Sequence, residues 1–312
     1  MLRNPAKEPN AVQCAVCGNE ATAGVPPKQH LAHHNSETYT LYRCDACQLQ
    51  FWWPLKADPS VYENEGFDAY SDYHAGKRPF PRWAEPLFAE LPSHREAALD
   101  IGCGDGSVLN RLAQAGFAAH GIDLDEKSVL IAHTKFGLQN VATSTLGEYA
   151  KKCSSTGQQF GLITFFEVLE HQDAPREFLS QVRRLANAGA TVAGSVPNRA
   201  RFLAALDRKL SDGDLPPHHF LWFSEQALRF LLEKEGLEVV RIAKVGALPY
   251  WELAAKLRAA IDRKSKTWPG IGQRLLPPVL KALSPFAAVV PWLGMRLASP
   301  HLYFECRVTT GR

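Results

Sequence analysis

The sequence has no long hydrophobic run and little net charge, and each absence excludes a class of protein. No stretch of about 18 or more uncharged apolar residues occurs, so a membrane-spanning helix is not expected. The N-terminal segment MLRNPAKEPN lacks the apolar core of a signal peptide. The formal net charge is only +3 over 312 residues, which argues against a polycation built to bind nucleic acid. These absences predict a cytoplasmic protein.

Cysteines are too unevenly placed for a disulfide framework. Their number is seven, and an odd total cannot pair completely within one chain. Together with the missing signal peptide, this indicates a reducing compartment. Four of the seven form two CxxC pairs, Cys14/Cys17 and Cys44/Cys47, and the other three are scattered.

The two CxxC pairs predict a structural zinc site. Each pair can present two thiolates to one ion, and two pairs complete a tetrahedral shell with no position left for substrate. The 26 residues between the pairs leave room for a strand hairpin. They also contain His30, His33 and His34, which are possible substitutes for a ligand, although four cysteines favour all-cysteine ligation. Gln48 follows the second pair where glycine is common, which weakens that turn without removing a ligand.

Strand and helix patterns alternate through most of the remaining chain. Short apolar runs bounded by glycine or proline indicate buried strands, and apolar residues at helical spacing indicate the helices between them. This alternation predicts an α/β fold with a mostly parallel sheet covered on both faces. The strands are expected at 97–103, 118–124, 141–146, 160–168, 189–197, 237–245 and 301–310, and the helices at 83–91, 107–117, 126–136, 174–187 and 224–236.

A glycine-rich loop, DIGCGDG at 100–106, joins the first of these strands to its helix. Glycines let the backbone turn tightly and let a ligand approach closely. The third glycine of a dinucleotide fingerprint is missing, because Ser107 stands in its place. Asp100 and Asp105 would also repel a pyrophosphate. S-adenosylmethionine carries an ammonium and a sulfonium instead, and a carboxylate at this strand end suits that cation.

The next strand ends in an acid at the spacing that ribose binding requires. Asp123 lies 21 residues after Gly102 and could accept both ribose hydroxyl protons. Asp125 is a nearby alternative that either faces solvent or caps the following helix.

These motifs resemble those of the class I S-adenosylmethionine-dependent methyltransferases. FGLITFFEVLEH at 160–171 is similar to the fourth-strand motif of the branch that contains the ubiquinone-biosynthesis O-methyltransferases, and the resemblance covers roughly residues 97–245. It implies a Rossmann-like seven-stranded sheet with an antiparallel last strand at 301–310. It places Glu167 and its neighbours beside the methionine half of the cofactor, with Thr145-Leu146 as a weak match for the adenine contact. The implied cofactor-binding residues are Asp100, Gly102, Cys103, Gly104, Asp123, Leu124 and Glu167.

Three histidines are candidates for the chemistry of methyl transfer. A hydroxyl or acidic carbon acceptor needs a base near the carboxyl ends of the strands. His171 follows the fourth strand and is the first candidate for that base, the alternative being that it caps a helix or orders a loop. His218 and His219 could line an acceptor pocket, act as a base or simply pack. A metal there would need carboxylates as well, and only Asp212 and Asp214 are close in sequence.

The positive charge is concentrated in one segment. Residues 250–300 hold eight Lys or Arg and two acids, a net charge of +6. The apolar run at 282–295 is too short to span a membrane but could lie in its interface. A lid, a dimer contact and an RNA-binding surface are the competing interpretations, and no RNA-module motif supports the last of them.

Together these patterns predict a zinc-ribbon-like module at 1–56, a linker and lead-in helix at 57–96, and a methyltransferase domain at 97–310 with an insertion at 246–300. The expected function is methyl transfer to a small-molecule, sugar or lipid-linked acceptor, with possible peripheral membrane contact and no nucleic-acid partner. The alternatives are an RNA methyltransferase that uses the zinc module and the insertion, and a non-catalytic S-adenosylmethionine-binding protein.

Overall fold

A computed structural model describes residues 11–32, 35–57, 74–93, 96–201, 204–205, 208, 212–247, 278–279, 281–283, 285, 289, 292–293 and 299–309. The expected insertion at 246–300 and the linker from 58 to 73 thus lie almost entirely outside the described residues. No helix within the described ranges is both long enough and apolar enough to cross a bilayer.

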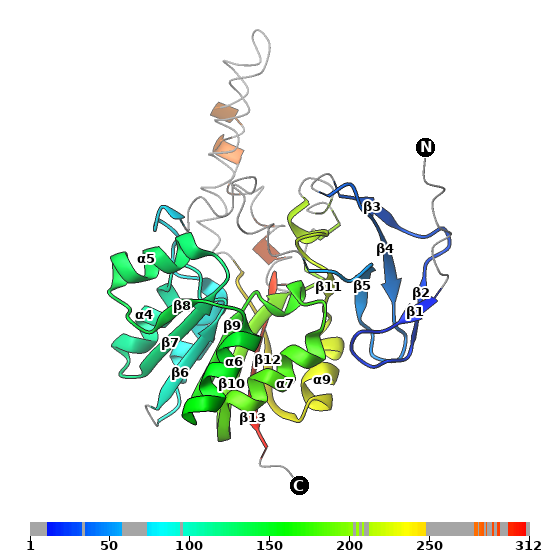
Figure 1. The fold of residues 1–312 in the computed structure, drawn as a ribbon. Coiled ribbons are helices and arrows are strands. Elements are labelled where there is room, and N and C mark those ends of the chain that lie inside the picture. The colour runs from blue at the N-terminus through cyan, green and yellow to red at the C-terminus, as the bar shows by residue number, and fades with distance from the viewer. Residues whose placement is uncertain are drawn as a thin grey trace.

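The larger of two sheets has seven strands in the order β12-β13-β10-β9-β6-β7-β8 (Figure 1). The strands are β6 (Ala97–Ile101), β7 (Ala118–Asp123), β8 (Val141–Thr143), β9 (Phe160–Phe166), β10 (Ala186–Pro197), β12 (Leu237–Val245) and β13 (His301–Val308). β13 runs antiparallel to both of its neighbours, and the pairs from β10 to β8 are parallel. The predicted mostly parallel sheet with an antiparallel last strand is therefore confirmed.

Helices cover both faces of this sheet, as parallel strands require. On one face, α4 (Ser107–Gln114) and α5 (Glu126–Phe136) lie with the lead-in turn η1 (Arg82–Ala84) and α3 (Glu85–Ala89). On the other lie α6 (Leu146–Thr156), α7 (Pro175–Leu185) and α9 (Glu225–Lys234). The lead-in helix expected at 83–91 thus begins with a 3-10 turn.

The smaller sheet contains the four cysteines. Its strands are β1 (Ala11–Gln13), β2 (Glu20–Ala23), β3 (Gln29–Leu31), β4 (Thr38–Arg43), β5 (Gln50–Trp53) and β11 (Leu221–Trp222). They run in the order β1-β2-β4-β5-β11, with β3 also paired to β4. The expected hairpin between the cysteine pairs is instead three strands. β11 comes from the middle of the chain, so the N-terminal sheet is completed by the region predicted to be the methyltransferase domain.

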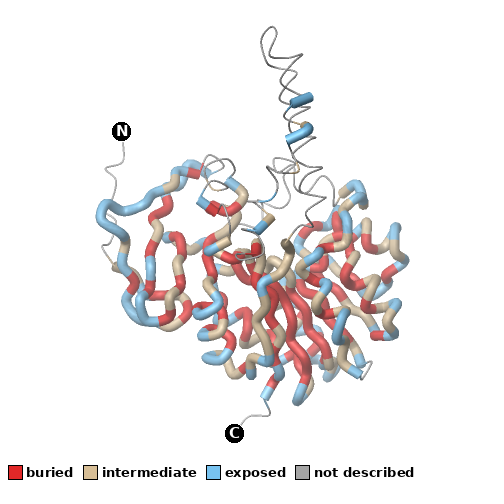
Figure 2. The backbone as a smooth tube through the Cα atoms, turned by 180° about the vertical axis from the view of Figure 1, so that it is seen from behind, coloured by how far each residue is buried: buried red, intermediate tan, exposed pale blue. Residues whose placement is uncertain are grey.

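The hydrophobic core crosses the boundary between the two sheets. Tyr42 and Trp52 of the N-terminal sheet belong to one buried cluster with Leu231 of α9 and Phe165 of β9. Figure 2 shows buried backbone concentrated in the large sheet and continuing into the strands of the smaller one. The two sheets therefore share one continuous packed interior.

Further differences from the sequence prediction lie at α6, β8 and β10. α6 was not predicted, and the strand expected at 141–146 ends at Thr143 because Thr145 begins this helix with a capping box closed by Glu148. β10 begins at Ala186 rather than 189, directly after α7, and a register irregularity between Ala186 and Thr191 lets it start early.

Candidate functional site

A cavity of about 640 Å³ opens at the carboxyl ends of β6, β7 and β9. This is the edge at which ligands bind in open α/β sheets, and the volume is in the range of small-molecule sites. Every sequence-predicted cofactor and acceptor residue lines it: Asp100, Gly102, Cys103, Gly104, Asp123, Leu124, Glu167, His171, His218 and His219. Thr145 and Leu146 line it as well.

The glycine loop has the left-handed backbone that its sequence predicts. Gly102, Gly104 and Gly106 all have positive φ, at 70°, 52° and 78°. A Cβ at Gly102 would lie 2.6 Å from Cγ2 of Val168, so the loop can pass this side chain only without one. The loop N–H of Gly104 is held by Oδ2 of Asp123 at 2.7 Å. The glycine loop is therefore tied directly to the end of β7.

Asp100 is buried at the end of β6 with a single neutral donor. Thr164 donates its hydroxyl to Oδ1 of Asp100 at 2.6 Å, and Asp100 is only 2% exposed. Burial raises the pKa of Asp100 to about 7; the Thr164 hydrogen bond opposes that rise and the charge of Asp123 adds to it. A cation in the cavity would favour the ionised carboxylate.

Asp123 and Asp125 differ in what their carboxylates bind: Asp123 holds the glycine loop, and Asp125 caps a helix. Asp123 accepts the backbone N–H groups of Gly104 and Asp125, and burial raises its pKa. Asp125 caps α5 by accepting from the N–H groups of Lys127 and Ser128. Of the two, Asp125 is thus the capping residue, and its carboxylate also pairs with His74 at 2.6 Å.

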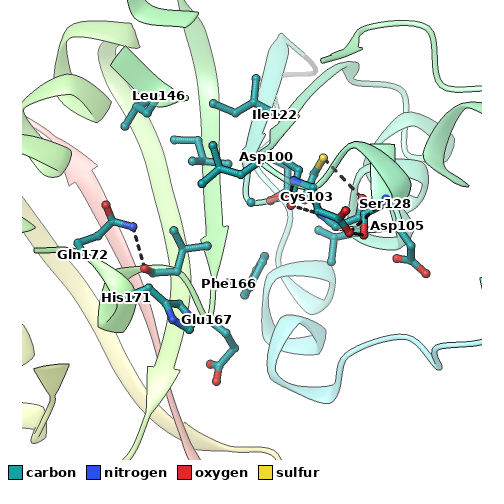
Figure 3. Close-up of a pocket in the computed structure, with 18 of the residues that line it drawn as sticks. Asp100, Cys103, Asp105, Ile122, Ser128, Leu146, Phe166, Glu167, His171 and Gln172 are labelled. Carbon is teal, nitrogen blue, oxygen red and sulfur yellow. Dashed lines mark hydrogen bonds between the residues drawn. The ribbon is translucent and has the colours of Figure 1, made fainter. Parts of the chain in front are cut away.

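The opposite wall carries Glu167, His171 and Gln172, which Figure 3 shows across from Cys103 and Asp105. Glu167 has a φ of 56°, an uncommon conformation for a non-glycine residue. Its carboxylate accepts from Ser195 at 2.6 Å and contacts Nδ1 of His301 at 3.0 Å. Burial acts to raise the pKa of Glu167, but the charge and hydrogen bond of His301 outweigh it and lower the pKa.

Three histidines meet at one end of the cavity. The rings of His218 and His219 stack at 4.5 Å, and His171 contacts each of them at 4.7 Å. His171 holds its Nδ1 2.6 Å from the carbonyl oxygen of His218. A carbonyl only accepts, so Nδ1 of His171 carries the proton and Nε2 is the basic nitrogen. Burial, then the charge of His219, lowers the pKa of His171 to about 3, which keeps the ring neutral at pH 7.

Buried acids lie next to this cluster. Oδ1 of Asp214 lies 3.2 Å from Nδ1 of His219, and Asp214 also pairs with Arg201 at 3.0 Å. Oε1 of Glu170 lies 3.8 Å from Nε2 of both His171 and His219, and neither oxygen of Glu170 has a hydrogen bond to a residue that the structure describes. Burial and then the charge of Glu167 hold the pKa of Glu170 well above its usual range. Ring nitrogens of the three histidines lie within 4.8 Å of one another, close enough to share a cation.

Several cavity residues had no recognised sequence pattern. Trp83 stacks on His301 at 4.6 Å, and the guanidinium of Arg78 lies 5.3 Å from the Trp83 ring. Both belong to the lead-in segment and line the cavity. Gln172 and Phe166 line it as well. Phe166 lies within the fourth-strand motif and Gln172 directly follows it, so only these two could have been found from the motif itself.

The four cysteines form a second site, within the N-terminal sheet. Their sulfurs lie within 4.8 Å of one another, with Cys14 to Cys47 at 3.6 Å and Cys17 to Cys44 at 3.3 Å. Zn–S bonds of about 2.3 Å in a tetrahedron place sulfurs ~3.8 Å apart, so the four thiols fit zinc with small adjustment. His30 is not part of this group, because its Nε2 contacts the carbonyl oxygen of Pro216 at 3.1 Å. His33 and His34 lie outside the described residues.

Comparison with known proteins agrees with the fold and the loop. The profile of a family described as "methyltransferase domain" matches residues 58–242, more than half of the chain. The ubiquinone biosynthesis O-methyltransferase of Methylococcus capsulatus is 37% identical over 105 residues, 33% of this chain and 44% of that protein. Its counterpart in Bordetella avium is 32% identical over 158 residues, 46% of this chain and 63% of that protein. The chain thus spans about half the length of the curated relatives it matches.

A solved structure of a mycolic acid cyclopropane synthase shares the fold. Its TM-score is 0.51 at 13% identity, over 81% of this chain and 99% of that one. At this identity the likeness speaks for the fold alone. The family match, the seven-stranded sheet and the glycine-loop cavity together place the chain in the class I S-adenosylmethionine-dependent methyltransferases, with an N-terminal four-cysteine cluster suited to structural zinc.

Proposed function

We propose that the protein transfers the methyl group of S-adenosylmethionine to a small-molecule acceptor held beside His171, His218 and His219. One observation carries this proposal: the glycine loop and the three imidazoles line the same cavity. Cofactor and acceptor can therefore meet in one cavity, and displacement at an activated methyl carbon mainly requires such positioning.

The proposed cofactor contacts follow from the cavity walls. Asp100 would face the ammonium group, since it is a buried carboxyl whose ionised form a cation stabilises. Asp123 would accept the ribose hydroxyls, and Cys103 and Leu124 would flank the sugar. Gly102 and Gly104 would let the cofactor approach the backbone. Glu167 would lie beside the methionine half, and Thr145-Leu146 beside the adenine.

His171 is the proposed general base. Its Nδ1 is already committed to the His218 carbonyl, so the neutral ring presents Nε2 as the proton acceptor. Oε1 of the buried Glu170 lies 3.8 Å from that nitrogen. His218 and His219 would form the acceptor pocket around it.

The proposed acceptor is amphipathic, either quinone-like or a sugar or lipid-linked molecule. The relatives above are named for ubiquinone biosynthesis and O-methylation, which supports a hydroxyl on a ring as the methylated group. We also propose a division of the chain into three parts. These are a zinc-ribbon-like module at 1–56, a linker and lead-in helix at 57–96, and the methyltransferase domain at 97–310.

Transfer of a labelled methyl group tests this function. Purified protein, deuteromethyl-labelled S-adenosylmethionine and a metabolite extract from a strain lacking the protein are combined, and mass spectrometry identifies the labelled product. We expect a small-molecule product with the wild-type protein, and at least ~100-fold less with His171→Gln, the usual cost of losing a general base. Label found in RNA alone would refute the small-molecule proposal, and absence of cofactor binding would refute methyl transfer.

A further inference from the structure

One short segment, residues 214–222, touches both the four-cysteine module and the cavity. Toward the module, Leu221 and Trp222 of β11 pair with Phe51 and Gln50 of β5. The backbone N–H of Trp52 donates to the carbonyl oxygen of Phe220 at 3.0 Å. The end of this segment is thus a strand of the N-terminal sheet.

Toward the cavity, the same segment carries the stacked His218 and His219. The N–H of Phe220 donates to the carbonyl oxygen of Glu170 at 3.0 Å, and the carbonyl of His218 accepts from His171. Every histidine of the cluster is therefore either on this segment or bonded to it.

Side chains fix the segment against the module. Trp52 and Trp222 meet edge to face at 5.4 Å, and they are only 0% and 4% exposed. His30 reaches Pro216 from β3. A buried aromatic pair contributes about 0.5–1.5 kcal/mol beyond its area, so this contact resists displacement.

The position of β5 depends in turn on the second cysteine pair. Cys44 directly follows β4, and its N–H donates to the carbonyl oxygen of Leu49, one residue before β5. The turn that carries Cys44 and Cys47 is therefore also the turn that joins β4 to β5. A metal that holds both sulfurs would fix this turn, because the free energy of metal binding adds directly to the free energy of folding.

We infer that metal binding by the four cysteines positions His218 and His219, so that the N-terminal module forms part of the acceptor side of the cavity. The histidines' role toward an acceptor rests on the proposed function; the mechanical link from the cysteines to the histidines does not. Trp52 is the positioning residue of this link, and it is neither among the residues that line the cavity nor one of the four cysteines.

Hydrogen exchange of the full chain, measured by mass spectrometry with and without zinc, tests the link. Removing zinc with a chelator should raise exchange about tenfold in peptides covering 214–222, as well as in β5, while β6 and the glycine loop keep their protection. Refilling with zinc should restore the slow exchange. If β5 exchanges faster after zinc removal but 214–222 does not, the inference is overturned. Loss of protection throughout the seven-stranded sheet would also overturn it, because zinc would then stabilise the whole protein and not this segment.

A pair of neighbouring variants separates the link from the metal. Trp52→Leu removes the contact with Trp222, whereas Trp53→Leu changes the next residue of the same strand, which is 37% exposed. With zinc bound, only Trp52→Leu should accelerate exchange in 214–222 and shift the imidazole resonances of His218 and His219. Equal behaviour of the two variants would refute the role of Trp52. The affinity of both variants for S-adenosylhomocysteine should stay within about threefold of the wild-type affinity. If the wild-type protein does not bind S-adenosylhomocysteine at all, the proposed function is refuted, but the exchange result still holds.

Discussion

At the residue scale, the fold opposes the ionisation of the Asp100 carboxyl in the glycine-loop wall. Its pKa is raised to about 7 in the folded chain, from about 3.9 when exposed. The folded state therefore holds a proton that the unfolded state releases between about pH 4 and pH 7. Stability from this group is complete below pH 4 and is lost as the pH rises through 7.

Asp100→Asn should remove this pH dependence. The amide keeps an acceptor for Thr164 and carries no charge, so the variant without ligand should be more stable than the wild type at pH 8 by about 1–3 kcal/mol. The difference should shrink toward pH 4. Urea unfolding at several pH values measures it, and an advantage that is the same at pH 4.5 and pH 8 would contradict the assignment.

Asp123 should contribute to cofactor affinity through hydrogen bonds. Asp123→Ala is expected to weaken S-adenosylmethionine binding by ~1–3 kcal/mol, because a buried hydrogen-bonding group loses its partner. Calorimetry measures the affinity. Glu238→Ala is the control, since Glu238 is exposed in β12 and is not among the residues that line the cavity. Equal affinities for the two variants would rule out the ribose role.

At the element scale, two glycines with the same backbone conformation allow the cost of a left-handed residue to be separated from the cost of a side chain in the cavity. Gly102 and Gly137 have nearly the same φ, 70° and 68°, but only Gly102 lines the cavity. A Cβ at Gly137 meets nothing within 4 Å, whereas one at Gly102 meets Val168. The two positions therefore differ in surroundings and not in conformation.

Gly137→Ala should cost about 1–2 kcal/mol of stability, the price of a left-handed alanine, and leave cofactor binding unchanged. Gly102→Ala should cost more and also abolish binding, since the added methyl displaces the loop or Val168. Thermal unfolding and calorimetry on both variants check this pair of outcomes. Binding by Gly102→Ala at wild-type affinity would show that the cofactor does not use this loop.

Elements with a local pattern were predictable from the sequence, and elements defined by distant partners were not. The strand at 97–101 and the acid at 123 could be located because apolar runs and loop spacing are local. α6 carries its own signals, the Thr145 to Glu148 capping box and Gly157 at its end, so it could have been found. β11 has two residues and exists only because β5 lies beside it. The same holds for Trp83, which joins the cavity through long-range packing.

At the scale of the whole molecule, the four-cysteine site should hold one zinc per chain. Cys14→Ser and Cys44→Ser remove one ligand from each CxxC pair, and both should lose the metal and destabilise the N-terminal sheet. Metal analysis of the purified proteins gives the stoichiometry. Cys153→Ser is the control, because Cys153 lies in α6 and outside the cluster. A full complement of zinc in both ligand variants would exclude this site.

The basic segment predicts attachment to anionic lipid. Each Lys or Arg near such a surface contributes about 1 kcal/mol, and the net charge of 250–300 is +6. The intact protein should sediment with anionic vesicles at low salt, and a variant lacking 270–298 should not. If the intact protein stays in the supernatant, the segment does not anchor the protein, and a lid or dimer contact becomes the better interpretation.

The place of β13 inside the sheet has a consequence for synthesis on the ribosome. β13 lies between β10 and β12 but is translated after both, and after the whole of 246–300. Until it emerges, β10 keeps one open edge, and β12 lacks the only strand that it pairs with in the described part of the chain. Open strand edges attract other chains, so the nascent protein carries an aggregation-prone edge throughout translation of the insertion. Slower translation of 246–300 would prolong this exposure.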